Sequence, residues 1–321
     1  MRRWLQAGEG FGRPVRPTDV ADAAALARLP DEQHNGLMVL YAGVDIGSAT
    51  AKAVVIDVAG VAGAPGAAGA AGVAGAAGAA GPVIVGKALR PVGYDIEAAG
   101  WAVLLEAREA AAPAGSTELP PLAGVIATGY GRHAFPGAGA AVTEITCHAR
   151  GSVELVPGVR TVIDVGGQDF KVIAVGPQGR VLDFVMNDKC AAGTGRFLEV
   201  MARALEVPLD EFGPLSLQAR ASAEVSNTCT VFAESEVISL RASRRPKEDI
   251  IAGIHKAMAR RIAGLARRVE LGSPIVMTGG AARNIGLVRA IETELAVELV
   301  VPELAPYAGA LGAALLAMEK A

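Results

Sequence analysis

One short pattern occurs twice in this chain and constrains its fold more than any other feature. Each copy consists of an apolar run typical of a β-strand, a glycine turn that carries an acidic residue, and a second apolar run. The first copy contains DIGSATAK from Asp45, and the second contains DVGGQDFK from Asp164. An internal duplication of this kind predicts two lobes of similar architecture.

Strands and helices alternate around both copies. Apolar runs predict strands at 39–46, in a run ending at Asp57, and at 82–89, 122–127, 161–165, 170–175, 179–185 and 274–278. Apolar residues at three- and four-residue spacing predict helices at 95–111, after Cys190, at 251–269 and at 306–318. This alternation is typical of the α/β class.

The length of 321 residues fits two lobes of about 150 residues each. We expect lobe I at 39–150, lobe II at 151–305, and a C-terminal helix at 306–321 that packs back on lobe I. Residues 1–38 are polar and contain proline but no continuous apolar segment, so we expect a poorly ordered N-terminal extension there.

An uncharged, Ala/Gly-rich run follows the first copy of the pattern. Glycine occupies every third position from Gly60 to Gly81. This glycine content disfavours a transmembrane helix, and no aromatic or basic anchors flank the run. A collagen-like segment would need more proline and three chains. We therefore expect a low-complexity loop at 58–82, inserted between two strands of lobe I.

The charge and the cysteine content exclude several classes of function. The net charge of -3 and the isoelectric point near 5.9 give no indication of a basic surface that would bind nucleic acid. The sequence also lacks a long basic run of the kind that binds anionic membranes. Three cysteines without a signal-peptide pattern indicate a reducing compartment. We therefore expect a cytoplasmic protein without disulfides.

Two of the cysteines lie just before predicted helices. Cys190 in NDKCAAGTGRF precedes a turn of small residues, and Cys229 in NTCTVFAESEVIS follows thirty-nine residues later. Two thiolates are half of a four-ligand metal site, whereas the simpler interpretation is that both are ordinary buried thiols. Cys147 has no second cysteine at metal-ligand spacing, so we expect a buried structural thiol there.

Other polar residues give weaker signals. No two histidines have ligand spacing, so structural or solvated roles are expected for His34, His133, His148 and His255. Arg132, Arg196 and Glu234 are candidates for cleft or interface residues.

The two acidic glycine turns have the chemistry of a triphosphate site. Glycine lets backbone N–H groups approach phosphate oxygens, and the carboxylates of Asp45 and Asp164 can hold Mg2+ or its waters. Lys52 adds a cation near the first turn. A single D-x-G is common in ordinary turns, but two matched copies followed by GGAARN at Gly279 are more specific. No GxxxxGK[ST] loop occurs, so this is not a Walker A site.

The order of these motifs resembles the actin, Hsp70 and sugar-kinase superfamily. Within it, five segments resemble the ATP-dependent activators, or component A, of 2-hydroxyacyl-CoA dehydratases: NDKCAAGTGRF, NTCTVFAESEVIS, DIIAGIH, VMTGG and PYAGALGAALLA. The ATPase subunits of benzoyl-CoA reductase share the pattern more loosely. The resemblance covers nearly everything from Val39 to Ala321, and residues 1–38 and the Ala/Gly run depart from it.

The resemblance implies a two-lobed ATPase fold with duplicated mixed sheets flanked by helices, and ATP or ADP with Mg2+ in the cleft between the lobes. It also implies a homodimer that shares one [4Fe–4S] cluster, with Cys190 and Cys229 of each subunit as ligands. A two-fold axis would supply the second pair of thiolates. Helix N-termini directed at the cluster would stabilise its negative charge.

The resemblance further implies roles for the residues of the cleft. Asp45 and Asp164 would bind Mg2+ and, with Gln168, form the catalytic group around the attacking water. The nucleotide is expected to contact Gly47, Ser48, Lys52, Gly166, Gly167, Asp169, Gly279, Gly280 and Asn284.

The function implied is an ATP-hydrolysing electron-transfer protein. It would receive an electron from ferredoxin or flavodoxin and inject it, at low potential, into a 2-hydroxyacyl-CoA dehydratase or a related iron–sulfur reductase. An ATPase subunit for benzoyl-CoA reductase or another double-cubane reductase is the first alternative. A sugar or acid kinase without a cluster is an alternative of another class.

Overall fold

The computed structural model describes residues 38–58, 81–116, 118–187, 191–226 and 229–321. Most of the N-terminal extension, most of the Ala/Gly-rich loop, and Cys190 therefore lie outside the described residues.

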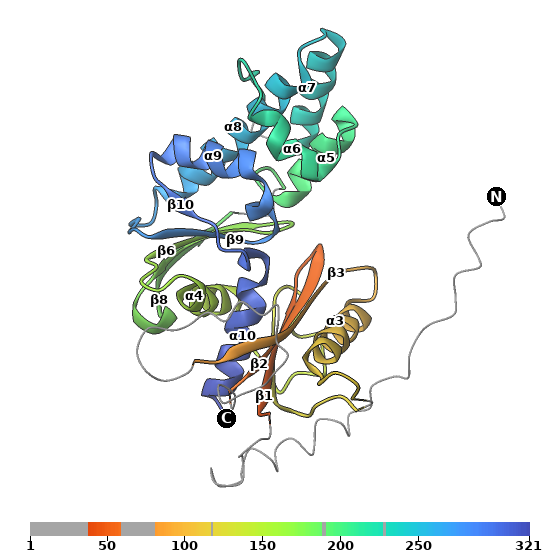
Figure 1. Cartoon of the computed structure of the whole chain (residues 1–321). Helices are drawn as coiled ribbons and strands as arrows, with labels where there is room; N and C mark the ends of the chain where they lie inside the picture. The colour runs from red at the N-terminus through yellow and green to blue at the C-terminus, as the bar shows by residue number, and fades with distance from the viewer. Residues whose placement is uncertain (1–37, 59–80, 117, 188–190, 227–228) are drawn as a thin grey trace, which may run out of the picture.

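The described chain contains two five-stranded sheets (Figure 1). The first has the order β3-β2-β1-β4-β5 and the second the order β10-β9-β6-β7-β8. In the first sheet the strands are β1 (Leu40–Ile46), β2 (Thr50–Asp57), β3 (Val83–Pro91), β4 (Leu122–Thr128) and β5 (Ala140–Ala141). In the second they are β6 (Thr161–Val165), β7 (Phe170–Val175), β8 (Val181–Met186), β9 (Ile275–Thr278) and β10 (Leu299–Val300).

Both sheets are mixed and repeat the same arrangement. β1 is antiparallel to β2 and parallel to β4, and β6 is antiparallel to β7 and parallel to β9. In each sheet a third antiparallel strand extends the hairpin outward, β3 in the first and β8 in the second. The predicted duplication of mixed sheets is therefore confirmed.

The register places equivalent residues opposite one another in the two hairpins. Asp45 pairs with Lys52 across β1 and β2, and Asp164 pairs with Lys171 across β6 and β7. Each aspartate therefore has a lysine as its cross-strand neighbour, close enough for an ion pair.

The parallel strands continue this symmetry. The opposed pairs are Asp45 with Thr128 on β4 and Asp164 with Thr278 on β9. A glycine with positive φ follows each threonine, Gly129 at 88° and Gly279 at 85°. A Cβ at these glycines would lie 2.4 Å and 2.3 Å from a carbonyl oxygen of the neighbouring central strand. Both the φ angle and the space therefore require glycine.

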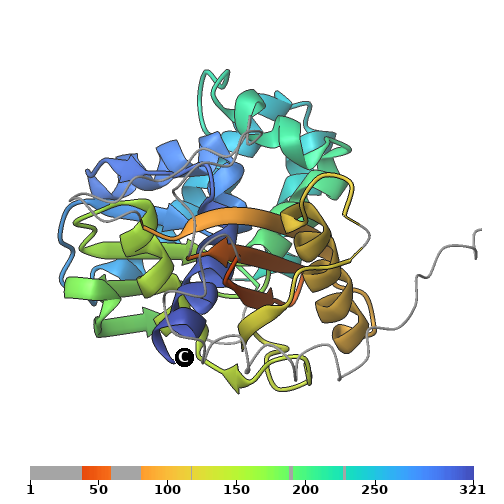
Figure 2. The ribbon, with the colours of Figure 1, turned by 60° about the horizontal axis from the view of Figure 1, so that its bottom comes forward.

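Two helices lie between the sheets. α10 (Ala308–Glu319) packs on β1 and β4, and α4 (Glu144–Leu155) packs on β6, β7 and β8. Figures 1 and 2 both show the blue α10 between the green α4 and the red-orange strands of the first sheet. On the other face of the first sheet, α3 (Ile96–Ala111) covers β1, β2 and β3.

The remaining long helices gather beyond the second sheet (Figure 1). They are α5 (Gly195–Leu205), α6 (Leu209–Ser216), α7 (Thr230–Ala242), α8 (Lys247–Ala266) and α9 (Ile285–Leu295). α8 is the longest helix of this group, and it packs in a large apolar core with Phe197 of α5, Phe212 of α6 and Leu287 of α9. None of the described helices is both long enough and apolar enough to cross a membrane.

α4 and α10 touch through their backbones. A Cβ at Gly312 of α10 would lie 1.8 Å from the carbonyl oxygen of Cys147, and a Cβ at Gly151 of α4 would lie 2.0 Å from that of Ala308. Gly43 of β1 also lies against the backbone of α10, because a Cβ at Gly43 would lie 2.0 Å from the carbonyl oxygen of Ala310. Only glycine fits at these three contacts, because real Cβ atoms do not approach backbone atoms so closely.

Gly312→Ala is expected to lower the free energy of unfolding by about 3 kcal/mol, because its methyl group must push α4 and α10 apart. The measurement is urea unfolding followed by circular dichroism. Gly264→Ala is the matched control, since Gly264 lies in α8 with nothing within 4 Å of its ideal Cβ position. There, the better helix propensity of alanine should add about 0.5 to 1 kcal/mol. Equal stability of the two variants would contradict the close packing of α4 and α10.

Candidate functional site

A cavity of about 950 Å3 lies between the two sheets and receives side chains from both. Every residue predicted to bind the nucleotide or Mg2+, or to act in catalysis, lines it: Asp45, Gly47, Ser48, Lys52, Asp164, Gly166, Gly167, Gln168, Asp169, Gly279, Gly280 and Asn284. Of the three candidates for cleft or interface residues, Arg196 lines the cavity, whereas Arg132 and Glu234 do not. The fold therefore brings together residues from the β1–β2 turn, the β6–β7 turn and the segment after β9. Their individual roles stay predictions.

On the side of the first sheet, the cavity wall is the turn between β1 and β2. Lys52 Nζ lies 3.2 Å from Asp45 Oδ2, and both side chains are largely buried. The backbone N–H of Gly47 donates to the oxygen of Thr50 at 3.1 Å, which closes the turn. An aspartate and a lysine thus lie side by side at the base of this turn.

On the side of the second sheet, one buried lysine gathers three carboxylates. Lys171 Nζ lies 2.6 Å from Glu144 Oε2, 2.7 Å from Asp169 Oδ1 and 3.7 Å from Asp164 Oδ2. Burial alone would lower the pKa of Lys171, but these three carboxylates raise it above its ordinary value. Lys171 therefore remains a cation, and it ties α4 to the β6–β7 turn.

Asp164 has further partners on the side away from Lys171. Thr278 Oγ1 donates to Asp164 Oδ1 at 2.9 Å, and His148 Nδ1 lies 3.3 Å from the same oxygen. Burial would raise the pKa of Asp164, but His148, Lys171 and the Thr278 hydrogen bond together hold it below its ordinary value. Asp164 therefore remains ionised at neutral pH.

These contacts involve four residues that we did not predict as site residues from the sequence: Glu144, His148, Lys171 and Thr278. A signal for Lys171 is present, since it follows Asp164 at the same distance that separates Lys52 from Asp45. Thr278 precedes glycine as Thr128 does. Glu144 and His148 come from a helix with no counterpart in the repeated pattern, and no sequence signal identifies them.

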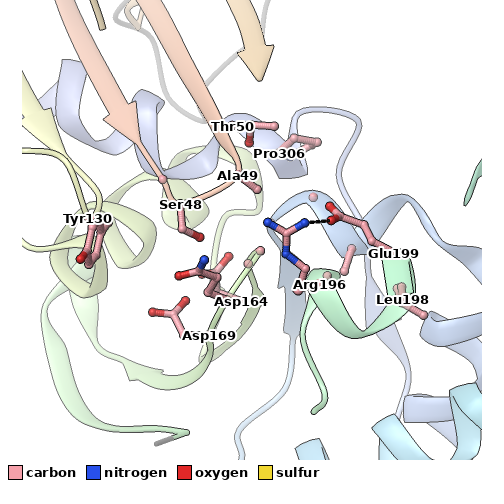
Figure 3. Close-up of a pocket in the computed structure, with 18 of the residues that line it drawn as sticks. Ser48, Ala49, Thr50, Tyr130, Asp164, Asp169, Arg196, Leu198, Glu199 and Pro306 are labelled. Carbon is pink, nitrogen blue, oxygen red and sulfur yellow. Dashed lines mark hydrogen bonds and ion pairs between the residues drawn. The ribbon is translucent and has the colours of Figure 1, made fainter. Parts of the chain in front are cut away.

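The tips of the two acidic turns touch across the cavity. An ideal Cβ at Gly167 would lie 2.7 Å from the Cβ of Ala49 and 3.3 Å from Ser48 Oγ. Figure 3 shows Ser48 and Ala49 on one side, with Asp164 and Arg196 facing them from the other. A ligand held by both turns is therefore enclosed between the two halves of the molecule.

The start of α5 is bonded directly to the second acidic turn. The N–H of Gly195 donates to the oxygen of Gly166 at 2.8 Å, and the N–H of Arg196 donates to the oxygen of Gly167 at 2.8 Å. The Arg196 side chain pairs with Glu199 at 2.8 Å and borders the cavity (Figure 3). Any displacement of this turn is therefore transmitted to the first residues of α5.

Asn284 caps α9 at the other end of the cavity. Its Oδ1 accepts from the N–H of Leu287 at 3.0 Å, and its Nδ2 lies 3.1 Å from His255 Nε2. Burial lowers the pKa of His255 to about 3, so this histidine is neutral at any physiological pH.

The described cysteines have different surroundings. Cys229 is the N-cap residue of α7, is partly exposed, and makes no side-chain capping bond. Cys147 is buried as expected, and burial raises the pKa of its thiol to about 12, so it stays protonated. Cys190 lies outside the described residues. Within the described part of the chain, no three His, Cys, Asp or Glu side chains converge as a metal site.

The sequence is similar to known proteins over most of its length. The sequence model of the family described as the BadF/BadG/BcrA/BcrD ATPase family matches residues 42–317. The chain is 49% identical over 197 residues to the 2-hydroxyisocaproyl-CoA dehydratase activator of Clostridioides difficile, covering 61% of this chain and 74% of that protein.

Two solved structures extend these similarities. The activator of 2-hydroxyisocaproyl-CoA dehydratase from Clostridium difficile with bound ADPNP has a TM-score of 0.74 at 38% identity, over 88% of this chain and 95% of that one. A ROK family glucokinase from Streptomyces griseus has a TM-score of 0.50 at 16% identity, over 87% and 99%. The second likeness concerns the fold alone, and it agrees with the predicted actin and sugar-kinase type of fold.

Lys171→Met is expected to lower the free energy of unfolding by about 3–5 kcal/mol, because it leaves buried carboxylates without their cation. The folded pKa of Asp164 lies below its unfolded value, so the carboxylate adds stability above about pH 4, and this is lost as pH falls through the folded value. In the Lys171→Met variant the folded pKa of Asp164 should rise, so the loss of stability in acid should begin at a higher pH.

Urea unfolding between pH 3 and pH 8 measures both effects. Lys256→Met is the matched control, because Lys256 is half-exposed and pairs loosely with exposed Glu224 at 3.8 Å. It should change stability by less than about 1 kcal/mol. If the two variants had the same pH profile, Lys171 would not hold the carboxylates as described.

Proposed function

Because this chain belongs to the BadF/BadG/BcrA/BcrD ATPase family, we propose that it is an ATP-hydrolysing activator of a 2-hydroxyacyl-CoA dehydratase. The activity proposed is the delivery of a low-potential electron to the dehydratase, with the electron drawn from a ferredoxin or flavodoxin. This function requires that ATP hydrolysis be coupled to electron delivery. The single observation that supports such coupling is the pair of backbone hydrogen bonds between the second acidic turn and α5.

The cavity suits a nucleoside triphosphate with Mg2+. Mg2+ is usually held by one or two carboxylates, phosphate oxygens and water rather than by a complete set of protein ligands. Asp45 and Asp164 supply one carboxylate from each half of the molecule, and the depressed pKa of Asp164 keeps it ionised. We assign Mg2+ to these two residues and the phosphates to the turns that begin at Gly47 and Gly166.

Hydrolysis needs groups that hold the phosphates and orient water. Lys52 lines the cavity, where it can offset negative charge, and Gln168 lies exposed on the second acidic turn, where an attacking water can be held. Asp45 orients Lys52. Loss of the γ-phosphate would remove the ligand that both turns share, and the second turn would then move relative to the first.

The second turn can transmit this movement to the cysteines. Gly195 and Arg196 bind the turn through their own N–H groups, and Cys190 stands only five residues before Gly195. A change in the turn would therefore shift the start of α5, which follows Cys190 closely in the sequence. The link from the phosphate end of the cavity toward Cys190 would thus run through main-chain atoms and need no side chain.

The thiol of Cys229 fits the role of a cluster ligand. It lies at the start of a helix, where the backbone dipole favours anions, and no capping hydrogen bond competes for its sulfur. We propose that Cys190 and Cys229 of two copies hold one [4Fe–4S] cluster, which supplies a one-electron carrier when bound. Val231 and Phe232, in the first turn of α7, are about 65% exposed, and a second copy would cover them.

A benzoyl-CoA reductase as the partner remains the alternative within the same mechanism. The identity of 49% to a dehydratase activator favours the dehydratase. A sugar or acid kinase is disfavoured, because the glucokinase likeness at 16% identity concerns the fold alone.

Anaerobically purified protein is expected to contain about four irons and four sulfides per dimer. Cys229→Ser should lose the iron and the dimer together, whereas Cys147→Ser should keep both, since Cys147 is buried away from solvent. Iron analysis, gel filtration and EPR of the dithionite-reduced protein measure these outcomes. An iron-free dimer with full ATPase activity would overturn the cluster proposal.

Gly195→Pro is expected to separate ATP hydrolysis from activation. Proline is tolerated at the first helical position, and the extended backbone of Thr194, with φ -116° and ψ 173°, suits a residue before proline. The substitution removes the N–H that donates to Gly166. ATPase activity should persist, while ATP-dependent activation of the dehydratase should fall at least about tenfold.

Gly195→Ala is the matched control, because it changes the same position but keeps the N–H group. Its activation should stay within about threefold of the unsubstituted protein. If Gly195→Pro activated the dehydratase normally, the hydrogen bonds from α5 to the second acidic turn would not carry the coupling.

A further inference from the structure

We propose that His255 is a positioning residue that holds together the two walls of the nucleoside end of the cavity. The inference rests on the proposed function, which assigns ATP to this cavity, and adds a residue that the function does not itself require. His255 lies in α8, behind the cavity lining, with only 1% of its surface exposed.

The first wall is the start of α6. Leu209 and Asp210 line the cavity there. One turn further along the helix, Phe212 is fully buried and meets the ring of His255 edge to face, with centroids 5.6 Å apart and an interplanar angle of 81°. This contact sets the position of α6 relative to α8.

The second wall is the segment between β9 and α9. It lines the cavity with Gly280, Ala281, Arg283 and Asn284. Asn284 is the residue of this wall that reaches His255, with 3.1 Å between Asn284 Nδ2 and His255 Nε2. Gly213 of α6 also packs against Asn284, since an ideal Cβ at Gly213 would be 2.9 Å from Asn284 Oδ1. His255 therefore contacts both walls at once.

The hydrogen-bond chemistry permits only one arrangement of these groups. The N–H of Leu287 can only donate, so the atom that receives it must be the carbonyl oxygen of Asn284. The amide nitrogen of Asn284 then points to His255 and donates, so Nε2 of His255 is the unprotonated acceptor. The ring proton consequently resides on Nδ1. The low pKa of His255 agrees with this neutral form.

The surroundings of Nδ1, on the opposite side of the His255 ring, indicate that the histidine does more than fill space in the core. Within the part of the chain that the structure describes, Nδ1 is buried without a hydrogen-bond partner. An ideal Cβ at Gly286 would lie only 2.7 Å from this nitrogen, so the ring abuts the backbone of α9. A buried N–H without a partner costs stability, which an apolar side chain of similar size would avoid. The acceptor that His255 offers to Asn284 is the one interaction here that such an apolar side chain could not make.

The consequence concerns the amide of Asn284. One of its two N–H groups is used by His255, and its oxygen is used by the cap of α9. The second N–H remains for an acceptor atom on the nucleoside. Without His255, only the cap of α9 would hold the amide, and Phe212 of α6 would lose the ring against which it packs.

The test compares two ligands that share phosphates but differ in the nucleoside. Isothermal titration calorimetry with ADP and with inorganic tripolyphosphate, both with Mg2+, is performed on the full chain. His255→Leu should weaken ADP binding about 5- to 10-fold, the effect of one lost hydrogen bond, and leave tripolyphosphate binding unchanged. In steady-state hydrolysis, the KM for ATP should rise by a similar factor with little change in kcat.

Two further variants keep the test decisive if His255→Leu does not fold. His255→Gln retains an acceptor oxygen and should bind ADP within about twofold of the unsubstituted chain, whereas His255→Asn is too short and should resemble His255→Leu. His133→Gln is the matched control, since His133 is exposed on the loop after β4. It should change neither affinity.

The outcomes separate this inference from the proposed function. Unchanged ADP binding in His255→Leu and His255→Asn, or an equal loss for tripolyphosphate, would overturn the role of His255 alone. Failure of the unsubstituted chain to bind ADP would overturn the proposed function as well.

Discussion

The backbone contact between α4 and α10 is the constraint on which the rest of the structure depends. Each helix packs on a different sheet, so the distance between them sets the distance between the sheets. It also sets the cavity, because α4 carries Glu144 and His148, and Gly309 of α10 lies against His148 Nε2 and Asp45 Oδ2. The two aspartates of the repeated pattern are thus held apart by a junction of glycine and small residues, which can pack this closely only because they lack bulky side chains.

The two halves share a plan but differ in their electrostatics. Asp45 forms an ion pair with Lys52, which itself lines the cavity, whereas Asp164 belongs to a buried network with Lys171, His148 and Thr278. A buried network of this kind is rigid when every member has a partner. The second half is therefore suited to hold a fixed charge, and the first half to adapt to the ligand.

Much of the fold was predictable, because the duplicated hairpins combine strong strand patterns with glycine turns. The strands β6 and β7 match their predicted bounds, and family membership confirms the resemblance drawn from the motifs. α4 was not predicted, because its buried face consists mainly of Cys147, Ala149, Gly151 and Ser152, which give no apolar periodicity. The aspartates and glycines of the site carry local signals, whereas Glu144, His148 and His255 acquire their partners only through tertiary packing.

The bonds between α5 and the second acidic turn have a consequence for how such a protein can diverge. They are made by main-chain atoms on both sides, from Gly195 and Arg196 to Gly166 and Gly167. Side-chain replacement leaves main-chain donors and acceptors in place, except where proline is introduced. The linkage is therefore robust to most sequence drift. The exposed surfaces of α5 and α7 can accumulate changes while these main-chain bonds are inherited intact.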